Sequence, residues 1–591
     1  FTLTLQSAVD INSSLTMRNS YKTLNANGNT INIAGNWTTN GGTFTHGNNT
    51  VIFDGGSQSL SGGSTFYNLR LWGSGTKTVG TGTWSSSGIA SAYTLGTEIG
   101  SGVTMNITAG ATWNFGTYGL WGAESPVSTP ILRVNGGTVH FNSDASIRAT
   151  TRIDMIDGAL YLHDDCHACG ILTQSGGLID NITYAGAQCN FRIYEGSSLT
   201  GGTLRLRYGY SGSARGFDIQ GSTTATNTHT LELGGIVSNS VKPSVAAGVA
   251  AELGNVVVNE SAGLTFGAGS SLIIRGAMTI ASDKTFTANG NPFTLIGNWT
   301  NNGTFTHGNN TVYLTGGNAT ITTGGHTWGK TFYNLNVTGA TKTLSNTLGI
   351  DNDITITGTL NQGIYNAYIR RNWNSSTGSV IVDNSTYTAF DGAVNGTINT
   401  AGNKHFGYLH INKTTGYGVS LLANTRCQHL VLTNGYYDIG TRDHRSDGVC
   451  YAYSGSQLRM SSGNMYLNNT SSSTGWSFGS LYMQAGATEN ITGGNIYIPG
   501  YGNSFRAMHI DGDFSPTGGT VFITGGSAVY IHGTTGTLRF NNLTINKTGS
   551  GLVRLSRNIG ISGILDVQST GATGGTSGGI EPEGYEIDME P

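Results

Sequence analysis

One long phrase occurs twice in this chain, almost letter for letter. Residues 35–56 read GNWTTNGGTFTHGNNTVIFDGG, and residues 297–317 read GNWTNNGTFTHGNNTVYLTGG. A second phrase follows each copy, FYNLRLWGSGTKTV at 66–79 and FYNLNVTGATKTL at 332–344. A unit of this kind cannot bury its own apolar face and must stack on its neighbours. The repeat therefore predicts a column of similar coils, each of roughly 20–25 residues.

Weaker copies of the second phrase extend the pattern. They stand at 406–416 (FGYLHINKTTG) and at 540–551 (FNNLTINKTGSG). A single hydrophobic core does not grow to 591 residues, whereas a solenoid adds core with every coil. The uneven spacing of the phrases also favours a solenoid, which tolerates insertions, over the alternative of tandem β-sandwich modules.

The blocks between the repeats resemble each other as well. Residues 196–221 parallel residues 486–512. The chain thus has the pattern of an old duplication with a seam near 265–290. We predict a first solenoid half at 1–265 and a second, duplicated half at 266–567.

Short runs of alternating apolar and polar residues indicate strands throughout. Examples are TVHF at 138–141, TLRLR at 203–207 and NIYI at 495–498. Such runs, rich in β-branched and aromatic residues, are typical of half-buried strands. The 92 glycines supply turns between the runs, and only eight prolines interrupt them. The expected fold is all-β, a long parallel β-helix (β-solenoid) with irregular insertions.

The phrases GNWTNNGTFTHGNNTVYLTGG and FNNLTINKTG, with their bias to Gly, Asn and Thr, resemble the repeats of extracellular parallel β-helix proteins. These are surface proteins of bacteria or archaea, adhesins and filament subunits of the filamentous-haemagglutinin and autotransporter type. The resemblance covers most of residues 1–567 and lies in the repeat pattern. It implies an extracellular or cell-surface location and a structural or adhesive role.

Composition narrows the set of partners. Charged residues make up 10% of the chain and the net charge is −3, so nucleic acid is not an expected partner. No run of 18 apolar residues is present, which predicts no transmembrane helix. A chain that begins with Phe1 fits a secreted protein whose signal peptide has been removed. Asn-x-Thr sequons then make glycosylation candidates of Asn36, Asn298, Asn412 and Asn546.

The two ends carry a separate prediction. Residues 568–579 have the composition of a Gly/Ser/Thr linker, and residues 580–591 are acidic. Two interpretations of the tail stay open: a disordered acidic segment, or a strand that adds to a neighbouring subunit. Head-to-tail contacts that do not close into rings give filaments. The apolar residues that alternate at the ends are the expected subunit contacts: Phe1, Leu3, Leu5, Tyr585, Ile587 and Met589.

The five cysteines leave several alternatives open. In an oxidising compartment disulfides are expected, and Cys427 lies about one coil from Cys450. Cys166 or Cys169 would pair with Cys189. Free buried thiols are the second alternative. Zinc is the third, since the segment HDDCHACG at 163–170 offers thiolates and imidazoles.

Metal binding and catalysis have weaker signals. Asp351 and Asp353 share a strand face and suit calcium. The metal candidates are therefore His163, Cys166, His167, Cys169, Asp351 and Asp353, and no cofactor other than calcium is expected. Parallel β-helices also include polysaccharide lyases, but no carboxylate pair here is accompanied by a basic residue, so we predict no catalytic residue and no enzyme.

Recurring aromatic and histidine positions indicate structure. His46 and His307 occupy equivalent turns, and Trp37, Trp299 and Trp373 equivalent core positions. We therefore expect a secreted structural subunit of a self-assembling filament or sheath, joined to its own copies by exchange of terminal strands. The alternative is a carbohydrate-binding or carbohydrate-degrading β-helix, such as an adhesin, a lyase or a tailspike-like protein, with cell-surface glycans as its partner.

Overall fold

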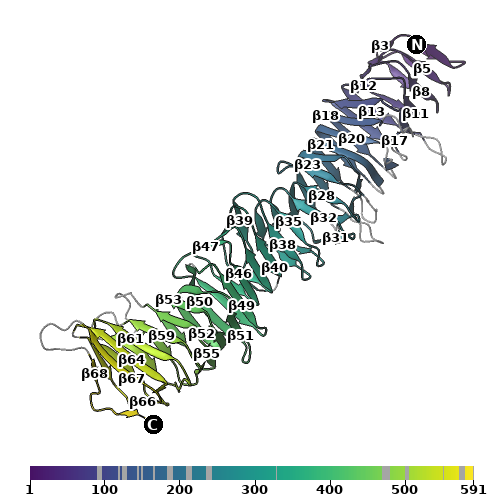
Figure 1. The fold of residues 1–591 in the computed structure, drawn as a ribbon. Helices are drawn as coiled ribbons and strands as arrows, with labels where there is room; N and C mark the ends of the chain where they lie inside the picture. Colours follow the sequence, from purple (N-terminus) through teal and green to yellow (C-terminus); the bar gives the residue numbers. More distant parts are fainter. Residues whose placement is uncertain are drawn as a thin grey trace. The chain divides into compact units, whose positions relative to one another are not determined.

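All secondary structure in the described part of the chain is β-strand. The computed structural model describes residues 1–88, 96–116, 120–122, 129–142, 146–147, 151–163, 167–182, 191–207, 216–234, 243–327, 329–402, 404–468, 479–499, 505–549, 551–570 and 579–589. Figure 1 shows successive strands stacked side by side within each part of the chain. The described residues contain no long apolar helix of the kind that crosses a membrane.

The chain divides into two compact units, Phe1–Asn310 and Thr311–Pro591. The repeat pattern places the seam of the duplication earlier, near 265–290. Compactness and repeat pattern are different properties of a chain, so the halves 1–265 and 266–567 stay a prediction.

The first coil shows how the first unit is built. Its strands β1 (Thr2–Thr4), β2 (Val9–Ile11) and β3 (Leu15–Arg18) belong to three different sheets. The next three strands lie on them one by one in parallel register, with Thr2 opposite Thr23, so a coil takes roughly 21 residues. These strands are β4 (Thr23–Asn25), β5 (Ile31–Ile33) and β6 (Trp37–Asn40).

Later coils of the first unit continue these columns. The first column ends at β7 (Thr43–Thr45). The second continues through β8 (Thr50–Phe53), β11 (Asn68–Leu71), β14 (Thr97–Ile99) and β17 (Leu120–Gly122). The third includes β9 (Gln58–Ser61), β12 (Thr76–Val79), β15 (Thr104–Thr108), β18 (Ile131–Phe141), β20 (Arg152–Leu162), β21 (His167–Asn181) and β23 (Ser197–Leu206).

The second unit repeats the arrangement. One column contains β38 (Thr311–Leu314), β40 (Asn334–Val337), β43 (Asp353–Ile356), β46 (Asn372–Ser375), β49 (Gly396–Thr400) and β51 (Gly418–Leu421). Another contains β42 (Leu348–Ile350), β45 (Ala367–Ile369), β48 (Tyr387–Gly392), β50 (Lys404–Lys413), β52 (Thr425–Asp438), β54 (Cys450–Ala452), β57 (Leu481–Met483) and β60 (Phe505–Ile510).

The strand ladders given for the described residues are parallel, for example β3 on β6, β11 on β14, β40 on β43 and β50 on β52, which confirms the predicted parallel β-helix. A sandwich would pair its strands antiparallel, so the alternative of tandem β-sandwiches is wrong. The alternation in the sequence gives the interior: in β11, Leu69 and Leu71 point inward and are fully buried, while Asn68 and Arg70 are partly exposed. Trp37, Trp299 and Trp373 are buried, as the repeat predicts.

The repeated histidines have the same structural role in both copies. His46 Nδ1 accepts a hydrogen bond from the backbone N–H of Asn48 at 3.0 Å, and His307 Nδ1 accepts one from Asn309 at 3.0 Å. Asn48 and Asn309 both adopt positive φ, at 62° and 66°, a conformation that Asn tolerates better than most residues. These histidines hold a turn, in agreement with the sequence prediction.

A recurring lysine lies inside each of four coils, and the sequence analysis did not single it out. Lys77, Lys342, Lys413 and Lys547 each belong to the second repeated phrase and are fully buried. Their ammonium groups donate to carbonyl oxygens of earlier coils. Lys77 Nζ, for example, lies 2.7 Å from Gly55 O, 2.6 Å from Gly56 O and 2.6 Å from Gln58 Oε1. The Lys77 ammonium is thus a donor to both carbonyls of the Gly-Gly turn, and Gly55 O also accepts from the backbone N–H of Ser74.

Burial has an electrostatic consequence for these lysines. Loss of water around the ammonium lowers the pKa of Lys77, Lys413 and Lys547 to about 8, and the nearby Asp54 carboxylate opposes this shift at Lys77. The charged form is therefore disfavoured in the folded chain relative to the unfolded chain.

We expect Lys77→Met to destabilise the first unit by about 1–3 kcal/mol, because the Gly56 carbonyl and the Gln58 amide oxygen lose their lysine donor, while Gly55 O keeps only the N–H of Ser74. The measurement is the free energy of unfolding from denaturant titration. Lys22→Met, at an exposed lysine of the same unit, is the control and should change stability by less than about 0.5 kcal/mol. Equal stability of the two variants would contradict the role assigned to Lys77.

Wild type and Lys77→Met should also differ in how their stability depends on pH. Between about pH 8 and the unfolded pKa near 10.5, the unfolded chain binds more protons at Lys77 than the folded chain does. Stability therefore rises with pH in this window, and Lys77→Met removes the share of that rise that comes from Lys77. The difference in free energy of unfolding between wild type and Lys77→Met should widen from pH 8 to pH 10. A constant or narrowing difference would show that burial does not depress this pKa.

Candidate functional site

The acidic tail forms the last coil of the chain's own solenoid. The strand β68 (Gly579–Glu581) lies parallel on β65 (Leu552–Leu555), and β69 (Ile587–Met589) lies on β66 (Ile559–Ile561). The interpretation of this segment as a disordered tail is therefore wrong. The expected linker at 568–579 is also shorter than predicted, because β67 (Leu565–Thr570) continues through its first three residues, and 571–578 lie outside the described residues.

Ion pairs hold the tail on the preceding coils. Arg554 Nε lies 3.1 Å from Glu581 Oε2 and 3.4 Å from Glu583 Oε1. Arg539 reaches Asp588 at 3.4 Å. These groups are substantially exposed, so each pair adds little by itself. Together they fix the acidic segment over two basic side chains of the body.

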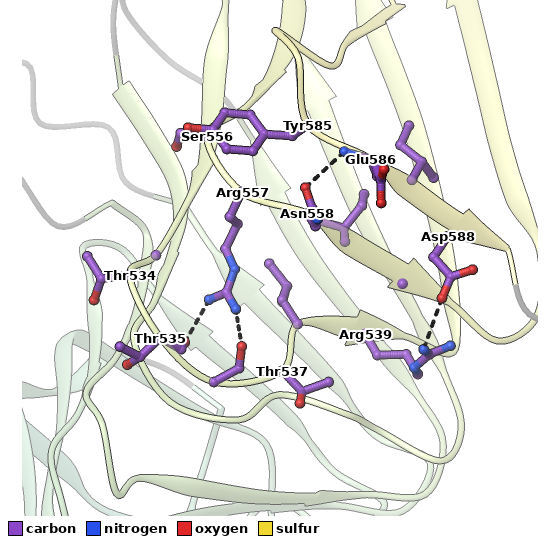
Figure 2. A pocket seen from close by; sticks show the side chains of 16 residues that line it. Thr534, Thr535, Thr537, Arg539, Ser556, Arg557, Asn558, Tyr585, Glu586 and Asp588 are labelled. Atoms are coloured by element: carbon purple, nitrogen blue, oxygen red, sulfur yellow. Dashed lines mark hydrogen bonds and ion pairs between the residues drawn. The ribbon is translucent and has the colours of Figure 1, made fainter.

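A groove of about 890 Å3 runs along the corners of the last coils (Figure 2). Three stretches of chain line it: 533–539, 556–560 and 585–588. Its floor carries the Arg557 guanidinium, which donates to Ile510 O at 2.6 Å, to Thr535 O at 3.0 Å and to Gly536 O. Burial lowers the pKa of Arg557, and nearby Asp511 and Asp513 oppose that shift. Arg557 therefore binds its own chain and holds the corner together.

The tail forms one wall of the groove. Figure 2 shows the Tyr585 ring beside Ser556, with Glu586 and then Asp588 of β69 farther along the same segment. The backbone N–H of Glu586 donates to Asn558 Oδ1 at 3.0 Å. Tyr585 is 41% exposed. The groove thus offers one aromatic face and two carboxylates next to the edge of the last coil.

Within the described residues, the interior rows of side chains become exposed at the first and last coils. Leu3 continues the inward row of Leu24 and Phe44 and is 52% exposed. Met589 continues the row of Phe540 and Ile561, both fully buried, and is itself 48% exposed. Of the 17 exposed large apolar residues in the described chain, seven lie in the first and last coils: Phe1, Leu3, Tyr21, Ile564, Val567, Tyr585 and Met589.

In the described part of the chain, the strands of the first and last coils also have one unpaired edge. Within the described residues, β1, β2 and β3 pair on one side only, with β4, β5 and β6. In the same way β67, β68 and β69 pair only with β64 (Asn542–Thr548), β65 and β66. Unpaired strand edges are templates for another strand. Of the expected contact residues, Phe1, Leu3, Tyr585 and Met589 are exposed there, and Leu5 and Ile587 are partly buried.

The predicted disulfide between Cys427 and Cys450 is not formed. Both cysteines are free and buried. The register explains why: Cys427 lies opposite Ser446, and Cys450 lies opposite Leu430. The positions are about one coil apart along the chain, but they occupy different places in the coil. Cys166 and Cys189 lie outside the described residues, as does the side chain of Cys169.

Cys427 instead belongs to a polar cluster in the core. Its Sγ lies 3.7 Å from His444 Nε2, and His444 Nδ1 lies 2.9 Å from the Tyr437 hydroxyl. Burial lowers the pKa of His444 to about 3 and raises the pKa of Cys450 to about 12, with that of Cys427 raised further. All these groups are uncharged near neutral pH, so the thiols are not activated as nucleophiles.

The metal candidates are placed as follows. Asp351 lies 3.3 Å from Arg370, and Asp353 lies 3.9 Å from Arg371, so each carboxylate faces an arginine of the next coil. His163 Nε2 lies 3.1 Å from His140 Nδ1, a neighbour the sequence analysis missed. Cys166 and the side chain of His167 lie outside the description. Within the described residues, no three His, Cys, Asp or Glu side chains gather as a metal site.

The glycosylation candidates lie at the surface. Asn36, Asn298 and Asn412 are exposed, and Asn546 is partly exposed.

Comparison of the chain with protein-family models, with curated proteins and with solved structures gives no match. The function of the groove and of the strand edges at the two ends is therefore inferred from their side chains, exposure and hydrogen bonds alone.

We expect Cys427 and Cys450 to be unreactive toward an alkylating reagent in the native protein and fully alkylated after denaturation without reductant. Peptide mapping by mass spectrometry distinguishes the cysteines one by one. The physical reason is complete burial of both thiols together with their raised pKa values. Recovery of a peptide that contains Cys427 linked to Cys450 would contradict this expectation.

Proposed function

We propose that this protein is the structural subunit of an extracellular filament or sheath, in which the last coil of one copy stacks on the first coil of the next. The observation that carries the proposal is the pair of uncovered interior rows that end at Leu3 and at Met589. Stacking would continue both the apolar column and the parallel ladders from one copy into the next. Such a contact joins two different surfaces and therefore propagates.

The topology supports this arrangement column by column. The last coil runs β67, β68, β69 and the first coil runs β1, β2, β3, so each end offers three strands to the other in the same order along the chain. Strand addition supplies main-chain hydrogen bonds, and the side chains that it buries supply specificity. Because the tail pairs with β66 of its own chain, this stacking replaces the exchange of terminal strands expected from the sequence.

Charge favours the same orientation. Residues 579–589 hold four acidic side chains and no basic one, whereas Arg18 and Lys22 of the first coil are exposed. Opposite charges on the two ends would speed the encounter and disfavour contacts between like ends. The effect should weaken with salt, because exposed charges are screened within about 8 Å at physiological ionic strength.

The test blocks one end at a time. Leu3→Lys places a charge on the first coil, and Met589→Lys places one on the last coil. Each variant alone should stay monomeric in analytical ultracentrifugation, whereas wild type forms long polymers visible by negative-stain microscopy. Both sites are about half exposed, so folding should be little affected.

A mixture of the two variants makes the test specific. Each blocked copy keeps one intact end, so an equimolar mixture should form heterodimers and nothing larger. Ile364→Lys, at a residue that is 71% exposed and lies away from both ends of the sequence, is the control and should polymerise like wild type. Polymers in either blocked variant alone, or monomers only in wild type, would overturn the proposal.

A further inference from the structure

A row of aromatic side chains lies on one outer face of the second unit. Tyr466 of β56 (Asn464–Leu467), Tyr497 of β59 (Asn495–Pro499) and Phe522 of β61 (Thr520–Gly525) are neighbours in register on three adjacent strands. The Tyr466 and Tyr497 rings stack at 4.9 Å and 5°, and the Tyr497 and Phe522 rings at 4.9 Å and 11°. All three are partly exposed. We call Tyr466, Tyr497 and Phe522 the aromatic row.

Planar amide and carboxylate groups run beside the aromatic row. Asp443 of β53 (Asp443–Ser446), Asn464 and Asn495 lie opposite one another on successive coils. Asn464 Nδ2 donates to Asp443 Oδ1 at 2.9 Å, and Asn495 Nδ2 donates to Asn464 Oδ1 at 2.9 Å. This ladder keeps its amides in a fixed orientation along the aromatic edges.

A cavity of about 240 Å3 opens at the Tyr466 end of the row. Its lining includes Asn424, Arg426, Asp443, Arg445 and Tyr466. Tyr497 stacks on one face of the Tyr466 ring. On the other side, Arg445 of β53 is the register neighbour of Tyr466, and both side chains line the cavity. The cavity therefore combines an aromatic ring with amide, carboxylate and guanidinium groups on a rigid sheet.

The charges around the cavity balance. Arg426 lies 3.0 Å from Asp447, and Arg445 lies 3.5 Å from the same carboxylate. Asp443 adds a second carboxylate to the lining of the cavity, so two arginines stand beside two aspartates. A site without net charge does not select a polyanion. An uncharged ligand that presents a flat apolar face and many hydroxyls fits it best, because an aromatic ring packs against the face and planar polar groups bind hydroxyls in pairs.

We infer that the aromatic row and its cavity bind a neutral polysaccharide, with one pyranose ring against Tyr466 in the cavity and the following rings along the row. The row spans three strands, about 10 Å at the usual strand spacing, which suits a short run of sugar units. The inference is independent of filament formation, since it uses a lateral face and not the ends.

The experiment measures binding to insoluble cellulose and chitin and to soluble mannan, with polygalacturonate as the anionic probe. The Leu3→Lys variant serves as the background, so that polymer formation does not multiply weak contacts. It should bind at least one neutral polysaccharide. Tyr466→Ala should weaken that binding by about tenfold, the loss of one aromatic contact.

Two matched variants separate binding from folding. Tyr466→Trp keeps an aromatic face and should retain binding, and Tyr313→Ala removes an isolated tyrosine, 37% exposed, and should leave binding unchanged. The inference would be overturned if the protein bound none of the neutral polysaccharides or bound polygalacturonate alone. Unchanged binding of the neutral polysaccharide by Tyr466→Ala would overturn it too. Equal loss in Tyr466→Trp and Tyr466→Ala would overturn it as well.

Discussion

The backbone hydrogen bonds between successive coils are the interaction on which this structure depends. A strand such as β5 has no partner within its own coil and pairs with β2 on one side and β8 on the other. Each coil therefore becomes stable only when a neighbour satisfies its donors and acceptors and covers its apolar residues. Hydrogen-bond pairing and burial of apolar residues both repeat once per coil, so each added coil extends the apolar rows and the hydrogen-bond ladders at the same time.

The same constraint explains the buried lysines and the character of the ends. Where the chain turns between columns, Lys77 and Lys342 donate from a later coil to carbonyls of the Gly-Gly turns. At the first and last coils a neighbour is lacking on one side within the described chain. There the inward row emerges at Leu3 and at Met589, and the three strand edges remain open. In the proposed filament a second copy would supply the strands and the apolar residues that pair with these ends.

Features that repeat with the period of the coil were predictable from the sequence. The two near-identical phrases predicted the parallel β-helix. Residues at equivalent positions of the two phrases predicted that Trp37 is buried and that His46 has a structural role in a turn. Features that depend on the place of a residue within the coil were not predictable. Cys427 and Cys450 have the spacing of one coil but face Ser446 and Leu430.

Two further neighbours were missed for related reasons. His140 lies one coil before His163, a spacing that the repeat period makes visible once the coil length is known. The aromatic row was hidden because its spacing along the chain is uneven: Tyr497 follows Tyr466 by 31 residues, and Phe522 follows Tyr497 by 25. Neither the contact of His140 with His163 nor the aromatic row can be recognised from residues that are adjacent in the sequence.

Hydrogen–deuterium exchange of backbone amides tests the stacking of end coils most directly. Wild-type protein is compared as polymer and as dilute monomer, with peptides that resolve each strand. The account predicts that exchange slows on assembly in β1, β2 and β3 and in β67, β68 and β69, where new ladders form, and stays unchanged in the interior strands. Protection confined to lateral strands such as β38 or β56, with exchange at both end coils unchanged, would contradict it.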